Sequence, residues 1–254
     1  MIPWARRRGT LAAAALALLA GWELLVLARA HSGAPTDDDY RAAAAAVTAE
    51  RQAGDLVVFA PRWSDPLARA AFGALVTVDD LARMDEASYA RIWEISIREA
   101  AAPETIGVGQ PDFQRRFGAV RVRRFARHAE RIVWRFHEGA EVKEVAHTPR
   151  RCHVVRGRRE ATVPTLGTRL VVRAGLADVW ARKENHAFAL LRVLVDGEER
   201  ARAVIGNDSG FVRLPEIAVP PGPHRVTFLQ EVAQAPGDPT RARLELCIAA
   251  EGRE

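Results

Sequence analysis

The stretch Arg-Ile-Val-Trp-Arg-Phe, residues 131–136, decides how the second half of the chain folds. Ile132, Trp134 and Phe136 fall on one face of a strand, and Arg131, Val133 and Arg135 fall on the other. A period of two is the pattern of a β-strand that has one buried face. We therefore expect Trp134 and Phe136 to be buried on one face of a sheet, and Arg131 and Arg135 to face solvent.

The same pattern continues toward the C-terminus of the chain. Turn residues at positions 196–197 (Asp-Gly) and 221–222 (Pro-Gly) separate short apolar segments. Short strands with turn signals at this spacing indicate an antiparallel, jelly-roll-like β-sandwich, which we assign to residues 129–254. The further strands that we expect cover residues 151–156, 168–174, 187–195, 200–205, 210–214, 224–233 and 241–250.

The preceding region, residues 36–128, alternates helical and strand patterns. Thr36 is a good N-cap, and three aspartates follow it in the first turn of an expected helix. The apolar run at 56–60 is typical of a strand that is buried on both faces. Further strands are expected at 75–78, 91–97 and 118–125. This order predicts a small α/β layer with a mainly parallel sheet.

The amino terminus carries an apolar run at residues 11–27, directly after three arginines at 6–8. The arginines should stay in the cytoplasm, so the chain after the run should be exported. Two interpretations of residues 1–30 stay open. They form either an uncleaved membrane anchor or a signal peptide that is removed near Ala30, after an A-x-A site at 28–30. Residues 31–35 then form a linker.

These interpretations fix the expected location of the protein. With an anchor, it lies on the extracytoplasmic face of the bacterial inner membrane, with a single pass and its N-terminus inside. With cleavage, it is secreted to the periplasm.

Three segments of the α/β region, 53–63, 91–93 and 116–120, resemble the soluble C-terminal α/β unit of GT-C (mannosyltransferase-like) bacterial membrane glycosyltransferases. The resemblance covers about residues 40–126. In that family the catalytic carboxylate lies in a membrane-proximal loop of a domain with many spans. Because this chain has at most one expected span, the resemblance implies a relative of the accessory part and not a complete transferase.

The segments 170–176, 193–197 and 222–226 resemble a galactose-binding-like jelly roll over about residues 150–250. Many such modules bind sugars, and others only pack against a neighbouring domain, so the resemblance does not choose between the two roles.

Composition excludes several classes of protein. A hydrophobic content of 48% is enough to form a core, and two cysteines exclude a disulfide-dense scaffold or a Cys-built zinc module. The sequence has no H-E-x-x-H, C-x-x-C, G-x-x-x-x-G-K or G-x-S-x-G pattern. We therefore expect no metal and no cofactor, and we assign no catalytic residue.

One candidate ligand site lies between two predicted strands of the sandwich. Sugar sites combine aromatic faces with planar polar groups, and this loop offers both, although it could equally be an ordinary loop. Its residues are Asp178, Trp180, Arg182, Asn185 and His186.

A second candidate site lies where the strand at 56–60 ends. Open α/β sheets bind ligands at the carboxyl ends of their strands. Arg62, Trp63 and Asp65 follow that strand directly. If the protein is an enzyme, we expect its site here.

Residues 113–173 hold sixteen basic and five acidic side chains. This segment could contact an acidic polysaccharide or lipid headgroups, or it could be a solvated face whose charges are paired within the protein. Export and the lack of interleaved aromatic residues speak against nucleic acid as a partner.

Cys152 and Cys247 are the only cysteines, and both lie in the part of the chain that we expect to be exported. Disulfides persist in such compartments, so we predict a bridge between the first and last strands of the sandwich. The alternative is two independent buried thiols.

Together these patterns favour a membrane-anchored, exported and non-catalytic binding or assembly protein, linked to envelope polysaccharide or glycoconjugate metabolism. Its partners would be the membrane, through residues 11–27, and a polysaccharide or other envelope proteins. The alternative is a carbohydrate-active enzyme, either related to glycosyltransferases or a hydrolase.

Overall fold

The computed structural model describes residues 4–136, 139–177, 188–206, 208–234 and 244–254. The chain divides into two compact units, which we describe separately. The first unit comprises residues 1–51, 58–73 and 93–125, and the second comprises 52–57, 74–92 and 126–254. The division differs from the expected boundary at 128/129 mainly because residues 74–92 belong to the second unit.

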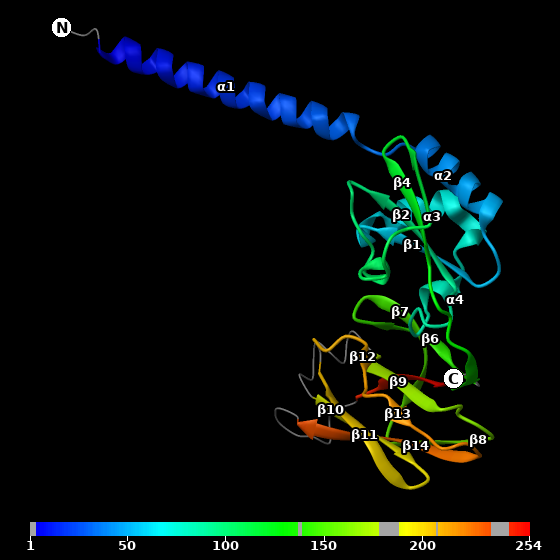
Figure 1. The fold of residues 1–254 in the computed structure, drawn as a ribbon. Helices are drawn as coiled ribbons and strands as arrows, with labels where there is room; N and C mark the ends of the chain where they lie inside the picture. The colour runs from blue at the N-terminus through cyan, green and yellow to red at the C-terminus, as the bar shows by residue number, and fades with distance from the viewer. Residues whose placement is uncertain (1–3, 137–138, 178–187, 207, 235–243) are drawn as a thin grey trace. The chain divides into compact units, whose positions relative to one another are not determined.

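The apolar run at 11–27 is helical, within α1 (Trp4–Ser32; Figure 1). Its side chains Leu18, Trp22 and Leu24 are exposed. Within the ranges given above, no helix meets the length and apolarity that a membrane crossing requires. The helix is therefore present where we expected it, and its role as a membrane anchor stays a prediction without support from the structure.

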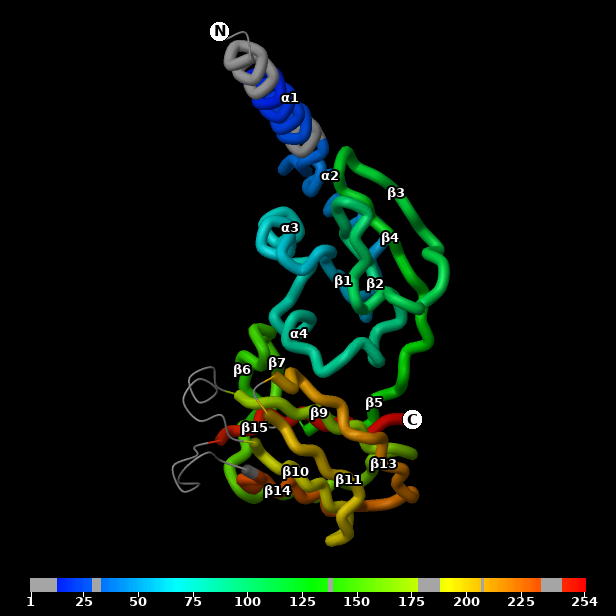
Figure 2. Tube along the Cα trace, turned by 90° about the vertical axis from the view of Figure 1, so that its left-hand side faces the viewer, coloured from blue at the N-terminus to red at the C-terminus, as the bar shows by residue number. Residues whose placement is uncertain are grey.

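The first unit is built on a four-stranded sheet in the order β1-β2-β4-β3, with β1, β2 and β4 side by side in Figure 2. The helix α2 begins with the expected cap, since the Asp39 amide donates to Thr36 Oγ1 at 3.2 Å and the Thr36 amide donates to Asp39 Oδ2 at 3.0 Å. The elements are α2 (Asp37–Glu50), β1 (Asp55–Ala60), α3 (Asp65–Phe72), β2 (Arg91–Ile97), β3 (Phe113–Phe117) and β4 (Val120–Ala126), with 3₁₀ turns at Arg62–Ser64 and Pro103–Thr105.

The sheet of the first unit is mixed, whereas the sequence predicted a mainly parallel one. β1 and β2 run in the same direction, because Arg91 pairs with Asp55 at their starts and Arg98 lies over Trp63 just beyond their ends. β3 and β4 pair antiparallel, with Phe117 opposite Val120.

β2 and β4 are antiparallel as well. The Arg127 amide donates to the Ala90 carbonyl, and Arg123 donates to Glu94, so the residue number rises on one strand as it falls on the other. The chain reverses at the two-residue turn 118–119 between β3 and β4, so β4 runs against both of its neighbours, β3 and β2.

Residues 74–92 do not form the expected strand at 75–78. They contain the end of a 3₁₀ turn (Gly73–Leu75) and the short helix α4 (Val78–Leu81). Thr77 caps α4, since the Asp80 amide donates to its Oγ1 at 3.1 Å. The Arg151 amide donates to the Ala82 carbonyl at 2.7 Å, which attaches this segment to the sandwich.

The second unit is a β-sandwich, as expected. One sheet has the order β11-β10-β14-β8, and the other has the order β12-β9-β15-β7-β6, with β13 on β9 and β5 on β15. Its strands are β5 (Ile132–Arg135), β6 (Glu141–Val145), β7 (Thr148–Val155), β8 (Arg158–Val163), β9 (Arg169–Leu176), β10 (Phe188–Val195), β11 (Glu198–Ile205), β12 (Val212–Arg213), β13 (Ile217–Ala218), β14 (His224–Gln234) and β15 (Leu246–Arg253).

The core of the sandwich lies between the two sheets. Leu246, Ile248 and Phe228 are buried there, and alternate residues of β15 point away from it. Trp134 and Phe136 pack against this core but are only partly buried. Both side chains thus lie on the expected face of the sheet, but they are less buried than expected. β5 pairs only with the last residues of β15, at the margin of the sheet.

Candidate functional site

The first predicted site, Asp178, Trp180, Arg182, Asn185 and His186, falls outside the described residues. The second predicted site is described, and we call its exposed part, Arg62, Trp63 and Arg98, the strand-end surface. Arg62 and Trp63 follow β1, and Arg98 follows β2.

Local hydrogen bonds position the indole of Trp63. The Ser64 amide and the Ser64 hydroxyl both donate to the Pro61 carbonyl, at 2.9 and 2.7 Å, and so close the turn that carries Trp63. The side chain of Trp63 remains 58% exposed. The guanidinium of Arg98 lies over the ring, with its Cζ atom 5.7 Å from the ring centroid. An exposed aromatic ring therefore stands beside a cation.

The turn that presents Arg98 has an unusual backbone. Arg98 and Glu99 have φ values of 53° and 58°, in the left-handed region that few residues other than glycine adopt. The Ala100 amide donates to the Ile97 carbonyl at 3.0 Å, so the two residues are the centre of a tight turn that follows β2. In the sequence, the only sign of this turn is the position of Arg98 directly after a predicted strand.

The carboxylates near the strand-end surface are already engaged. Asp65 Oδ1 accepts from Arg69 Nε at 3.0 Å within α3. Glu99 pairs with both Arg116 and Arg121. Asp65 was part of the predicted site, but it is committed to its own helix. The surface thus offers an aromatic face and guanidinium donors.

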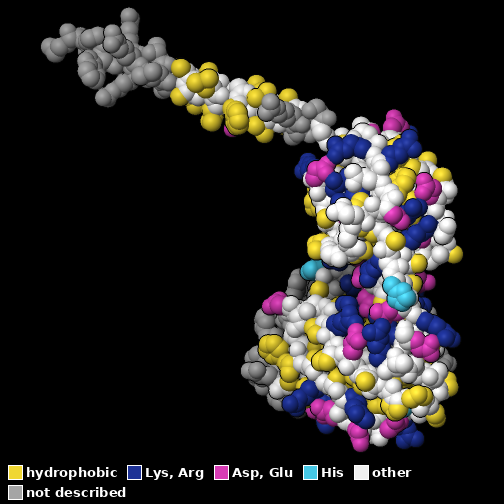
Figure 3. Space-filling model, viewed as in Figure 1, with side chains coloured by type: hydrophobic (Ala, Val, Ile, Leu, Met, Phe, Trp, Pro, Cys, Tyr) yellow, Lys and Arg dark blue, Asp and Glu magenta, His cyan; other side chains and the backbone are white. Residues whose placement is uncertain are grey.

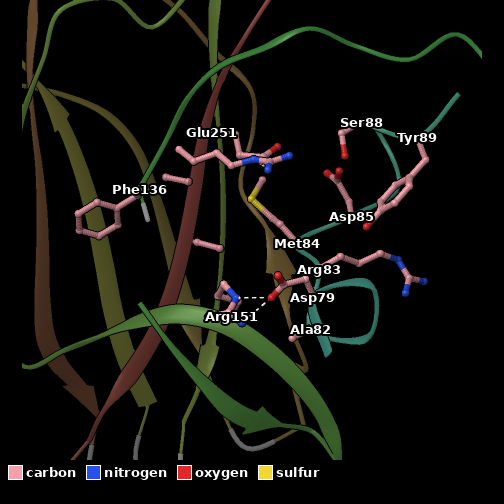
Figure 4. A pocket seen from close by; sticks show the side chains of 13 residues that line it. Asp79, Ala82, Arg83, Met84, Asp85, Ser88, Tyr89, Phe136, Arg151 and Glu251 are labelled. Carbon is pink, nitrogen blue, oxygen red and sulfur yellow. Dashed lines mark hydrogen bonds and ion pairs between the residues drawn. The ribbon is translucent and has the colours of Figure 1, made fainter. Parts of the chain in front are cut away.

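The second unit contains a cleft that the sequence did not predict (Figure 4). It has a volume of about 150 Å³ and lies between residues 79–89 and the outer face of β15. Its charges are matched, because Arg151 pairs with Asp79 and Arg135 Nε donates to Glu251 Oε1 at 3.1 Å. Other residues that line it are Arg83, Met84, Asp85, Ser88, Tyr89 and Phe136.

Tyr89 lines this cleft and lies beside the Asp80 carboxylate. Its hydroxyl donates to Asp80 Oδ1 at 3.2 Å. Burial, followed by the nearby Asp80 carboxylate, raises the pKa of Tyr89 above its ordinary value. The phenol therefore stays neutral and serves as a hydrogen-bond donor.

Beside the cleft, the guanidinium of Arg253 is buried among acidic side chains. Its Nη2 donates to both oxygens of Asp85, at 2.9 and 2.8 Å, and to Glu251 Oε2 at 2.6 Å. Its Nη1 donates to Glu130 Oε2 at 3.2 Å. Burial is the largest single effect and raises the pKa of Asp85. The charge and hydrogen bond of Arg253, the Ala87 amide and the charge of Arg173 together outweigh it, so the pKa is lowered. These groups satisfy one another, so we assign this cluster to the fold.

The structure contains the disulfide that the sequence predicts. Cys152 and Cys247 are bonded, with their Cα atoms 5.2 Å apart. They lie on adjacent strands of one sheet, since Cys247 on β15 is opposite Val154 on β7. The bond closes a loop of 95 residues.

Many arginines of residues 113–173 are paired with acidic side chains. Arg124 contacts both Glu50 and Asp112, at 3.0 and 2.8 Å, and Arg169 contacts Glu130 and Glu216, each at 3.1 Å. Figure 3 shows basic and acidic side chains intermixed on the visible face. These contacts favour the internally paired interpretation over a surface that binds polyanions.

No protein-family model matches this chain, and no curated protein is significantly similar to it. Among solved structures, it is similar to the CBM51-2 and INT domains of Clostridium perfringens ZmpB, in complex with GlcNAc. That match has a TM-score of 0.32 and 16% identity, and it covers 45% of this chain and 25% of that one.

A second match is a carbohydrate-binding module, CBM36, in complex with calcium and xylotriose. It has a TM-score of 0.30 and 9% identity, and it covers 48% of this chain and all of that one. Matches this distant carry no conclusion about the family or the ligand of this chain. They also give no support to the GT-C resemblance of the first unit, which stays a prediction.

Proposed function

We propose that the protein is an exported, membrane-tethered binding protein that recognises carbohydrate of the cell envelope at the strand-end surface and catalyses no reaction there. The observation that carries this proposal is the exposed indole of Trp63 beside the guanidinium of Arg98. A large aromatic ring left in water next to fixed hydrogen-bond donors is a favourable binding surface.

The chemistry of a sugar ring fits this surface. The apolar C–H face of a pyranose can stack on an indole, while its hydroxyl oxygens accept hydrogen bonds from guanidinium groups. Arg98 already lies against the ring of Trp63, and Arg62 is adjacent in the chain. Arg98 can therefore donate to the hydroxyl oxygens at the rim of a sugar that stacks on the other face of the indole.

The state of the carboxylates supports binding over catalysis. Glycoside hydrolysis uses two carboxyl groups that are placed on either side of the scissile bond. Asp65 and Glu99 both accept from arginines of their own unit. A catalytic role would require these ion pairs to break when substrate binds.

Two features support export. The bond between Cys152 and Cys247 is of a kind that forms and persists outside the cytoplasm. The apolar run within α1 follows three arginines, which is the pattern of a segment with its N-terminus in the cytoplasm. The anchor would hold both units at the outer face of the inner membrane.

The proposal is tested by calorimetric titration of the full chain with a panel of envelope oligosaccharides. We expect Trp63→Ala to weaken the best ligand about tenfold or more, as the loss of a central aromatic contact does. Ile106→Ala is a matched control, since Ile106 is another exposed apolar residue of the same unit, and it should leave the affinity unchanged.

A third variant separates the two predicted sites. If Trp180→Ala abolishes binding while Trp63→Ala has no effect, the ligand binds the loop at 178–186 and the proposal is wrong. Release of reducing sugar ends during the same titration would favour the enzyme alternative.

A further inference from the structure

His224, the first residue of β14, is buried with an acceptor at each of its two ring nitrogens. Its side chain is only 5% exposed. Nδ1 lies 2.7 Å from Asp196 Oδ2, and Nε2 lies 2.8 Å from the carbonyl oxygen of Pro220.

These two distances determine the protonation state of the ring. A neutral imidazole carries one N–H group and one nitrogen lone pair. Either neutral tautomer would place that lone pair against an oxygen lone pair at hydrogen-bonding distance. Only the imidazolium ion donates from both nitrogens at once, so the geometry requires a charged His224.

Asp196 is fixed by the same group of contacts. Its Oδ1 accepts from the Arg225 amide at 2.8 Å, and its own amide donates to the Arg225 carbonyl at 2.8 Å. Asp196 also has a φ of 54° in the Asp196–Gly197 turn between β10 and β11. The imidazolium thus joins three segments: this turn, the loop that contains Pro220, and the start of β14.

We propose that His224 and Asp196 form a proton-dependent clamp that fixes one end of the sandwich when His224 is charged and releases it when the ring loses its proton. Deprotonation would leave one of the two acceptors without a donor. The contact with the Asp196 carboxylate or the contact with the Pro220 carbonyl must then break.

The groups that hydrogen-bond to the ring favour its protonated form. The hydrogen bond to Asp196 and then the Pro220 carbonyl raise the pKa of His224, while burial opposes them. The pKa of Asp196 is lowered, first by the hydrogen bond from the Arg225 amide and then by His224 and the charge of Arg200. This carboxylate therefore stays ionised. On β8, the residue opposite His224 is Val163, which carries no charge.

The sign of the pH dependence follows from these shifts. A histidine whose pKa is raised on folding binds a proton more tightly in the native state. Its contribution to stability is full below the ordinary histidine pKa of about 6.5 and is lost as the pH rises through the higher native value. Alkaline conditions therefore open the clamp.

The clamp borders a groove of about 350 Å³ on the sheet that contains β8, β10 and β14. Asp196, Gly197 and Arg225 line this groove together with Leu194 and Thr227. The contacts of the clamp involve the backbone of two of these residues, Asp196 and Arg225. Its release would change the mouth of the groove, so the shape of this surface depends on pH.

The test is a side-chain ¹⁵N NMR titration of the histidines in the full chain between pH 5 and pH 9. We expect both nitrogens of His224 to be protonated at pH 7, with a midpoint above 6.5. The ring of His147 is 83% exposed and serves as the reference signal. A neutral His224 tautomer at pH 7, or a midpoint at or below 6.5, would overturn the proposal.

Substitution of the carboxylate sharpens this test. Asp196→Asn should lower the midpoint of His224, whereas Asp208→Asn, an exposed aspartate of a different loop, should leave it unchanged. Equal midpoints in the two variants would contradict the clamp. If Asp196→Asn does not fold, the titration of the natural chain decides the question alone.

Discussion

Among the described residues, each of the two units contains a charged side chain that is almost completely buried, and the two that we compare have opposite signs. In the first unit Glu94 is 0% exposed, and in the second unit Arg253 is 1% exposed. Glu94 accepts from the Ala102 amide at 2.9 Å and from Arg123 Nε at 2.9 Å, and it also contacts the Thr105 hydroxyl.

The difference lies in where the partners come from. Two partners of Glu94 are neutral groups only 8 and 11 residues away along the chain. Arg253 instead depends on Asp85 and Glu130, which are 168 and 123 residues away, and on Glu251 in its own strand. Most hydrogen-bond partners of Glu94 therefore come from nearby in the chain. Arg253 obtains its partners only when distant segments of the chain have come together.

The largest effect should come from breaking the cluster of the second unit. Among the described residues, Arg253→Met leaves the buried Asp85 with only the cation of Arg173, at 3.7 Å, and leaves Glu251 with only that of Arg135. Removal of one partner of a buried ion pair costs about 3–5 kcal/mol. Urea unfolding, with amide exchange at residues 188–205 to report on the sandwich, measures this loss.

Arg131→Met is the matched control for this variant. Arg131 also pairs with an acid, Glu254, but its side chain is 77% exposed. Exposed pairs contribute about 0–1 kcal/mol. A similar loss from both variants would show that burial of Arg253 has no special role.

A smaller effect should follow from removal of the disulfide. Cys152→Ala combined with Cys247→Ala should destabilise the sandwich by about 2–4 kcal/mol, the usual effect of losing a native bridge. Amide exchange should accelerate in β7 and β15, and exchange at residues 93–125 of the first unit should stay unchanged. Equal acceleration in both units would refute the assignment of this bond to one unit.

The smallest effect should come from the buried acid. Glu94→Gln keeps an acceptor for Ala102 and Thr105, and its Arg123 partner is 17% exposed and can be hydrated. We expect a loss of about 1–2 kcal/mol, confined to the first unit. Glu50→Gln, at an acid that is 44% exposed and also pairs with an arginine, is the control. If Glu94→Gln loses more unfolding free energy than Arg253→Met, the expected difference between the two buried charges is wrong.

Local pattern was enough to predict much of the fold. The alternation at 131–136 gave a strand of the sandwich, the apolar run at 56–60 gave β1, and Thr36 gave the start of α2. Each of these depends on neighbours within one element. The cysteine pair could be predicted because the chain contains only two cysteines.

The mistakes concern contacts between distant segments. Residues 74–90 lie directly before β2 in the chain, so we predicted that they belong to the first unit. Asp85, however, is held by Arg253 of the second unit. The antiparallel direction of β4 depends on the hairpin that joins it to β3, a strand that the sequence pattern did not predict. For the same reason Trp63 was predicted as part of a site, while its partner Arg98 was not.

The most direct test of the central claim, that Trp63 forms the ligand site, is to observe the tryptophan side chains during binding. The full chain with ¹⁵N-labelled indoles would be titrated with its best oligosaccharide. We predict that the indole N–H signal of Trp63 shifts in proportion to occupancy, while that of the buried Trp93 does not move. A shift at Trp180 with no change at Trp63 would contradict the account.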